Sequence, residues 1–133
     1  MPLKKLPDDF FKSMKTLKEV YLPLNLQKIE ANSLNGTGIT SITIPEGVFY
    51  IGEHALANNK IDTIILESKT LGVTSFIASD PFLNTRYYIK SVTIKRLDSI
   101  PANMFHETPI ESIELPSTVE EIGSYAFHAC YNL

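Results

Sequence analysis

The sequence lacks tryptophan, contains one cysteine and has no large excess of charge of either sign. A single cysteine, Cys130, cannot form an internal disulfide or a zinc site built from several cysteines. The net charge of −3 excludes a strongly basic nucleic-acid binder, so no nucleic-acid partner is expected. No stretch approaches the roughly 18 consecutive apolar residues of a transmembrane helix, so we predict no insertion into a membrane.

The beginning of the chain does not resemble a secretory signal. Lys4 and Lys5 are followed by Asp8 and Asp9 and not by an apolar stretch, so we predict no signal peptide in this chain. Hydrophobic residues make up 44% and charged residues 20% of the 133 residues. This balance is typical of a folded domain, and the length is sufficient for one.

The sequence repeats itself with a nearly constant period. A six-residue pattern, apolar-x-x-apolar-x-apolar, occurs five times, and Leu133 stands where a sixth copy would begin. A period near 22 residues lies within the range of about 20–29 that is typical of leucine-rich repeats. The five copies start at Leu17, Ile39, Ile61, Ile89 and Ile110.

A second mark recurs inside each period. An aliphatic residue is followed five positions later by Phe or Leu, and stacking of the repeats would bring the second member of each pair into one buried spine. No single repeat could bury its apolar face alone, so stability comes from its neighbours. The pairs are Leu6 and Phe11, Ile29 and Leu34, Ile51 and Leu56, Ile77 and Phe82, Ile100 and Phe105, and Ile122 and Phe127.

These patterns predict a leucine-rich-repeat solenoid. We expect a right-handed superhelix of about five to six coils, with short parallel strands forming one concave sheet and irregular or short helical returns on the convex side. All 133 residues form one domain, in which residues 1–16 are a half-repeat or a cap. The repeats cover residues 17–38, 39–60, 61–88, 89–109 and 110–132.

The strands are expected in the last four residues of each six-residue pattern. These residues alternate exposed with buried side chains and are enriched in β-branched types. Pro23, Pro45 and Pro116 follow three of the strands, and proline favours a turn there. Gly52 and Gly123 follow the aliphatic mark, where glycine suits a tight bend or a positive φ.

The stretch from Ile110 to Leu133 resembles a BspA-like leucine-rich repeat almost position for position. Its Pro116, the Ile122-Gly123 pair, Ala126-Phe127 and Cys130 stand where that family has Pro, Ile-Gly, Ala-Phe and Cys or Asn. The resemblance covers residues 6–133 and is weakest from Ile61 to Tyr88. It implies a bacterial surface-type repeat protein, located at the cell surface or secreted, that functions in cell adhesion by binding host matrix or cell-surface proteins.

Both ends of the chain fall within the repeat pattern. The first residues form the second half of a repeat, and Leu133 is the first residue of another. We therefore interpret the chain as part of a longer array or as an engineered segment, with a native N-terminal cap as the alternative. Uncapped coils would favour end-to-end self-association.

The residues capable of catalysis are few and poorly grouped. His106 and His128 occupy equivalent positions in neighbouring repeats, but two imidazoles without a third ligand make a poor metal site. No His–acid pair is spaced to activate Cys130. We therefore predict a non-enzymatic protein with no catalytic residues, no metal and no cofactor.

The outward side chains of the strands are the first candidate binding surface. They form rows in which hydroxyl residues dominate, and Tyr21 and Ile65 are the apolar exceptions. Exposed Ser and Thr also suit strands on propensity alone, so solubility is the alternative explanation. The outward residues proposed for binding are Glu19, Tyr21, Thr43, Ile65, Glu67, Thr93, Lys95 and Glu114.

The third repeat is the second candidate because it is 28 residues long. We expect about four of its extra residues between Glu67 and Phe76. The repeat also brings Arg86, Tyr87 and Tyr88, residue types that are favoured at interface hot spots. The alternative is that the tyrosine rings pack over the widened coil.

Two functions remain. The first is a protein-binding module that uses the strand face and the long repeat. The second is a structural spacer whose repeats hold another domain away from a surface.

Overall fold

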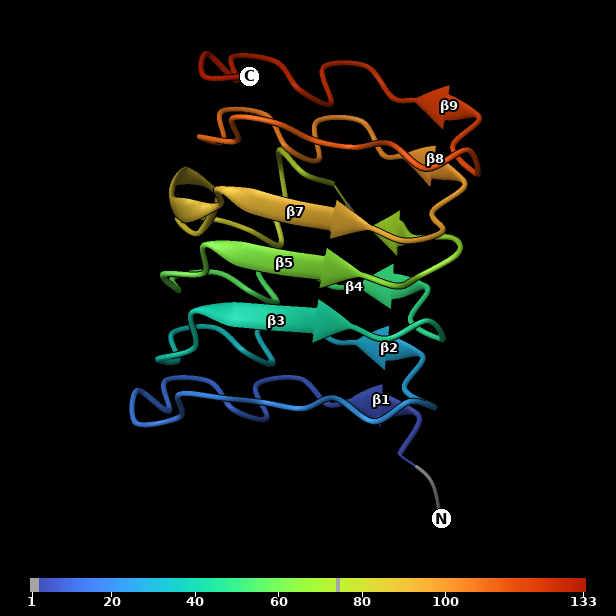
Figure 1. Cartoon of the computed structure of the whole chain (residues 1–133). Helices are drawn as coiled ribbons and strands as arrows, with labels where there is room; N and C mark the ends of the chain where they lie inside the picture. Colours follow the sequence, from blue (N-terminus) through green and yellow to red (C-terminus); the bar gives the residue numbers. More distant parts are fainter. Residues whose placement is uncertain (1–2, 74) are drawn as a thin grey trace.

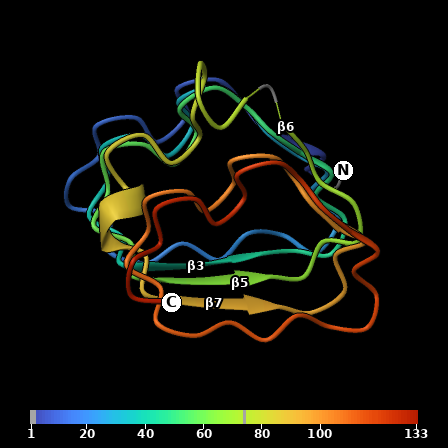
Figure 2. The same cartoon turned by 90° about the horizontal axis from the view of Figure 1, so that it is seen from above.

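Short parallel strands stack across successive coils of the chain and form a solenoid. This architecture is seen in the computed structural model, which describes residues 3–73 and 75–133 (Figure 1). One coil is one circuit of the chain, and viewed along the stack successive coils lie over one another, with the last coils, in orange and red, displaced from the earlier ones (Figure 2). The structure confirms the solenoid predicted from the repeats.

One side of the solenoid carries the longest strands. They are β3 (Ser41–Ile44), β5 (Thr63–Leu66) and β7 (Ser91–Ile94), which pair in parallel in that order. In β3 and β7, exposed and buried residues alternate as the sequence predicts. The register aligns Thr43 with Ile65 and Thr93, so the outward rows are formed across these three strands.

The predicted five-stranded sheet is shortened to three strands. Residues 19–22 and 112–115 run alongside the sheet but belong to no strand. Gly38 N donates a hydrogen bond to Leu17 O, just before the first run begins. Among the described residues, no backbone hydrogen bond then joins residues 19–22 to β3. Each run is outermost on this face and has a neighbouring run on one side only, whereas β3, β5 and β7 have one on each side.

A second set of strands, which the sequence analysis did not predict, lies on the adjacent side. Each strand has two residues and contains the aliphatic mark of its coil. One sheet has β1 (Lys5–Leu6), β2 (Lys28–Ile29), β4 (Tyr50–Ile51) and β6 (Gly72–Val73), and the other pairs β8 (Ser99–Ile100) with β9 (Glu121–Ile122).

The return side of each coil is built from tight turns with residues of positive φ. Asn32, His54 and Asn103 have φ near +57°, +52° and +61°, and a second such residue follows four positions later, as at Asn58. Asparagine tolerates this left-handed conformation better than most residues. The one helical element among the described residues is the 3₁₀ turn η1 (Arg86–Tyr88).

At four junctions between successive coils in the described residues, three backbone hydrogen bonds join the return sides. In one junction, the N–H groups of Asn32, Leu34 and Gly36 donate to carbonyls of residues 53, 55 and 57, at 2.9–3.0 Å. The same set joins the coils at residues 9–13, 54–58 and 103–107 to their successors. Both donors and acceptors are main-chain groups, so this ladder depends on the regular path of the backbone and not on particular side chains.

The ladder is interrupted between residues 80–84 and 102–106, where a buried ion pair takes its place. The Phe82 N–H donates to Asp80 Oδ1 at 2.9 Å, and Arg86 Nη1 donates to the carbonyls of Met104 and His106 at 3.2 and 2.8 Å. Arg86 Nη2 and Nε bind Asp80 at 2.6 and 2.7 Å. The ion pair therefore binds the Phe82 N–H and the carbonyls of Met104 and His106, main-chain groups that the ladder would otherwise use.

The core follows the predicted spine. Leu34, Leu56, Phe82 and Phe105 are buried, whereas Phe11 and Phe127 are partly buried and pack against the core. Ring centroids of Phe82 and Phe105 are 6.5 Å apart, and those of Phe105 and Phe127 are 5.8 Å apart. Stacked coils thus give the aromatic residues a continuous contact, as the repeat predicts.

The prediction for Ile77 was wrong. Its side chain is 60% exposed, and Val73 pairs with Ile51 in the register expected for Ile77. The spacing from Ile61 to Val73 is therefore the usual one, and the extra residues lie between Val73 and Phe82. Phe76 turns inward, is 1% exposed and contacts Phe82 with centroids 5.4 Å apart. The inserted aromatic residue helps to fill the widened coil.

Gly52 is required by a close approach between coils and not by a positive φ. A Cβ on Gly52 would lie 2.8 Å from Ala31 N, and one on Gly123 would lie 2.4 Å from Ala102 N. Of the six glycines, only Gly36 has a positive φ. The chain does turn directly after both glycines, at residues 53–56 and 124–129, and the close backbone of the preceding coil explains why a side chain is excluded there.

Candidate functional site

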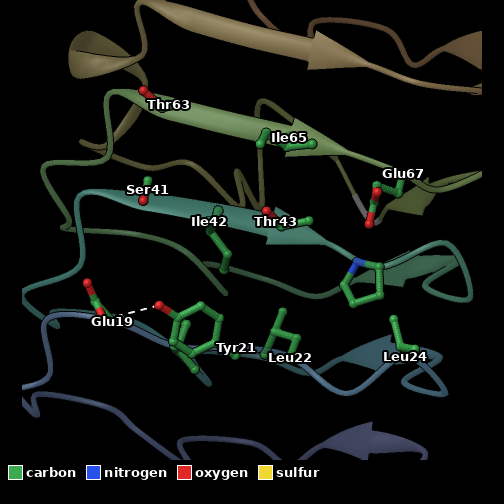
Figure 3. Close-up of a pocket in the computed structure, with 12 residues that line it drawn as sticks. Glu19, Tyr21, Leu22, Leu24, Ser41, Ile42, Thr43, Thr63, Ile65 and Glu67 are labelled. Atoms are coloured by element: carbon green, nitrogen blue, oxygen red, sulfur yellow. Dashed lines mark hydrogen bonds between the residues drawn. The ribbon is translucent and has the colours of Figure 1, made fainter.

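A cleft of about 430 Å³ opens on the strand face between residues 19–24 and β3 (Figure 3). It lies where these residues do not pair with the sheet, so the side chains of Val20, Leu22 and Ile42 line its apolar part. Hydroxyl groups of Ser41, Thr43 and Thr63 lie nearby, with Ile65 and Glu67 at the β5 side. The absence of strand pairing thus creates a recess in an otherwise regular face.

Tyr21 forms a free-standing aromatic wall of this cleft. Its side chain is 86% exposed, and its hydroxyl donates to Glu19 Oε2 at 3.2 Å. The hydrogen bond orients the ring beside the recess, as Figure 3 shows. Leu24 is 78% exposed at the other end of the same run. An aromatic residue of this kind offers apolar area together with a polar tip.

The cleft carries negative charge. Glu19 and Glu67 both line it, and neither forms an ion pair in residues 3–73 and 75–133. Lys18 is adjacent to Glu19 in sequence, but its Nζ lies against Gly38 at the preceding corner. The recess therefore combines an apolar floor, an aromatic wall and two carboxylates: Glu19, which accepts the Tyr21 hydroxyl at one end, and Glu67 at the other end.

A second cleft, of about 520 Å³, lies between β7 and residues 112–117. Thr93 and Glu114 line it, together with Lys90 and the partly buried Ile113. It contains one acidic and one basic residue and no aromatic residue. The two clefts have a common origin, because both flank the three-stranded sheet, but their chemistry differs.

The structure thus brings together five of the proposed binding residues at the first cleft and two at the second. Lys95 is exposed directly after β7, and Tyr87 and Tyr88 are 56% and 44% exposed in η1, at the corner before β7. The five at the first cleft are Glu19, Tyr21, Thr43, Ile65 and Glu67.

Arg86 is removed from this surface by burial. The residue is 1% exposed, and its guanidinium group is held by Asp80 and by two main-chain carbonyls. The expectation that Arg86 is a contact residue beside Tyr87 is corrected, because a partner protein cannot reach it. The carbonyls of Met104 and His106 accept hydrogen bonds from the Arg86 guanidinium group inside the protein, and these bonds keep the arginine buried although this residue type is usually exposed.

The apolar lining of the first cleft was not expected from the sequence. Val20, Leu22 and Ile42 were predicted as inward residues, and the failure of strand pairing makes part of them accessible from the strand face. Leu24, which follows Pro23, was not considered. An apolar residue at the exposed position after this proline is the signal that could have identified it.

The other chemically notable side chains are used within the fold. His106 Nε2 lies 3.2 Å from the carbonyl of Phe76, whereas His128 is exposed and packs edge-on against Tyr125. The Cys130 thiol donates to the carbonyl of Phe105 at 2.9 Å. Across the residues with described positions, no group of three His, Cys, Asp or Glu side chains could hold a metal ion.

Comparison with known proteins identifies the class of protein. A family model described as the BspA-type leucine-rich repeat region matches residues 4–133 in six copies. The chain therefore belongs to the BspA-type leucine-rich repeat family, as its repeats predicted.

The chain is also similar to one solved protein of the same general kind. The crystal structure of a leucine-rich repeat protein from Bacteroides ovatus ATCC 8483 aligns at 14% sequence identity and a TM-score of 0.36. The alignment covers 98% of this chain and 63% of the solved one, so this chain spans less than two thirds of that protein. No curated protein matches the sequence.

Family membership defines a coarse function. The chain is a repeat module of a family whose members generally mediate protein–protein interaction and are generally surface-exposed or secreted. This family and fold are typically non-enzymatic. None of the helices in the described part of the chain is long and apolar enough to cross a membrane.

Proposed function

We propose that this chain is a non-enzymatic adhesion module that binds a host matrix or cell-surface protein through its strand face. The observation that carries the proposal is the cleft beside β3, which is lined by the exposed ring of Tyr21 and four more of the outward residues. Exposed aromatic residues beside a recess are typical anchors of protein interfaces. Tyr87 and Tyr88 at the corner of η1 extend the proposed surface toward β7.

A structural spacer is the second candidate function. The observation that favours it is the row of small hydroxyl residues Ser41, Thr63 and Ser91, which is aligned across the three strands. Such a row supports strand formation and solubility without a ligand. The spacer and the adhesion module differ in the effect of substitutions on the strand face that leave the fold unchanged.

The test measures binding of the purified chain to immobilised matrix proteins, beside a variant carrying Tyr21→Ala, Ile65→Ala and Tyr87→Ala. We expect saturable binding by the parent and at least a tenfold loss in the variant, because truncation of interface anchors often costs more than about 1.4 kcal/mol, a factor of ten in affinity.

Two controls make the result specific. The circular dichroism spectrum of the variant should match that of the parent. A second variant, Tyr131→Ala, removes a ring that is 92% exposed but outside the strand face, and it should retain binding. No binding at about 100 μM, a concentration that detects weak complexes, would leave the spacer as the better candidate.

A further inference from the structure

The first cleft has the chemistry of a receptor for a long cationic side chain. We propose that it binds a lysine or arginine of a partner protein, presented on an extended basic segment. The inference rests on the proposed protein-binding function and specifies which part of a partner this cleft recognises.

The floor of the cleft suits the stem of such a side chain. Lysine and arginine carry several methylene groups below the charged head, and these groups prefer to lie along apolar surface. Val20, Leu22 and Ile42 provide that surface, because residues 19–22 do not pair with β3. The cleft volume of about 430 Å³ lies within the range of about 300–1,000 Å³ typical of ligand pockets.

The rim of the cleft suits the charged head. Glu19 and Glu67 are both at the cleft and are not paired with basic residues in residues 3–73 and 75–133. Glu19 and the ring of Tyr21 lie together at one end of the cleft, where the ring offers a face for a cation–π contact, and Glu67 lies at the other end, just after β5 (Figure 3). An acidic or purely apolar side chain would leave the carboxylates without a counter-charge, so the charge pattern selects a cation.

The second cleft provides a control within the same molecule. It also opens between the sheet and an unpaired run, but Lys90 is present with Glu114 and an aromatic wall is absent. If any recess beside this sheet attracted cations, both clefts would bind them. The proposal therefore predicts binding at residues 19–24 and none at residues 112–117.

The experiment is a nuclear magnetic resonance titration of the ¹⁵N-labelled chain with Nα-acetyl-lysine methylamide. Two matched compounds are used beside it: the norleucine analogue keeps the stem without the charge, and the glutamate analogue reverses the charge. We expect saturable shifts of the Tyr21 and Thr43 amides with the lysine compound. The norleucine compound should bind about fivefold more weakly, and the glutamate compound should give no localised shift.

Variants connect the shifts to the proposed residues. Glu19→Gln with Glu67→Gln should weaken lysine binding about fivefold, because the change removes charge while preserving shape. Tyr21→Ala should weaken it by a similar factor. Glu120→Gln, which removes an exposed carboxylate that lines neither cleft, should leave the affinity unchanged.

Three results would overturn the proposal: equal binding of the norleucine and lysine compounds, shifts centred on residues 112–117, or undiminished lysine binding in the double glutamine variant. Each differs from failure of the adhesion function. If the chain binds a matrix protein but not the lysine compound, the proposed binding function stands and the proposal that this cleft recognises a cationic side chain fails. A chain that binds only the lysine compound would support the cleft and argue against those matrix partners.

Discussion

At the scale of single residues, Asp80 and Arg86 stand where main-chain bonding between two coils is interrupted. Asp80 accepts the Phe82 N–H, and Arg86 donates to the carbonyls of Met104 and His106. Both residues are buried, with side chains 7% and 2% exposed. Removing one member of such a pair leaves the other charge buried without compensation.

Asp80→Ala should therefore lower the free energy of unfolding by about 3–5 kcal/mol. Urea denaturation followed by circular dichroism measures the change. The matched control is Glu46→Ala, which breaks the ion pair with Arg96, where the side chains are 60% and 46% exposed. The control should cost about 0–1 kcal/mol. Equal losses in the two variants would contradict the structural role assigned to Asp80.

Gly52 provides a second test at this scale. A Cβ at this position would meet the main chain of Ala31 at 2.8 Å, and backbone atoms cannot move aside as a flexible side chain can. Gly52→Ala should cost about 1–3 kcal/mol, the range for overpacking a tight contact. Gly72→Ala is the control, because its Cβ would lie 3.3 Å from Phe49 O. Thermal unfolding should place Gly52→Ala clearly below Gly72→Ala, and the reverse order would refute the close-approach argument.

At the scale of elements, the strands that the sequence predicts correctly are β3, β5 and β7, which belong to the three central coils of this face. The pattern Ser41–Ile44 specifies β3 because alternation, β-branched residues and the following Pro45 all favour the same structure. Residues 19–22 have a similar alternation, yet they form no strand. Local pattern specifies which way a side chain points, but pairing depends on the adjacent coil.

The long coil shows a second limit of prediction. Both Val73 and Ile77 are aliphatic, and the spacing to Phe82 favours Ile77, whereas pairing of β6 with β4 selects Val73. The sequence could identify an insertion but not the side of the aliphatic mark on which it lies. The same holds for Arg86: its residue type favours a surface role, and only its contacts in three dimensions reveal the buried one. The candidate residues Glu19, Tyr21 and Glu67 were found as members of rows, and their meeting at a cleft was not predictable.

At the scale of the whole molecule, stability is distributed unevenly along the stack. The central coils bury Leu34, Leu56 and Ile64 completely, whereas Ile122 and Tyr125 in the last coil are 52% and 66% exposed. In a repeat protein each coil is stabilised mainly by its immediate neighbours, so a coil with one neighbour opens more readily.

Hydrogen exchange should therefore be fastest in the last coil of this 133-residue chain. We expect amides of residues 121–133 to exchange at least tenfold faster than those of residues 41–66, because their opening requires less apolar surface to be exposed. Mass spectrometry of peptic fragments measures the two regions in one experiment. Uniform protection would indicate a single cooperative unit and would contradict the nearest-neighbour description.

The ladder on the return side has a consequence for how the gene can change. Its hydrogen bonds join main-chain atoms at the same three positions of successive coils, so they place little demand on side-chain identity. Unequal recombination that duplicates or deletes one whole 22-residue unit would preserve this bonding. The coil with the insertion after Val73 keeps the ladder to the preceding coil, but the ladder to the following coil is interrupted, and Asp80 and Arg86 bind the main chain there instead. Phe76 fills the widened coil beside Phe82. Copy number can thus drift freely, whereas a change of repeat length survives only with several matched substitutions.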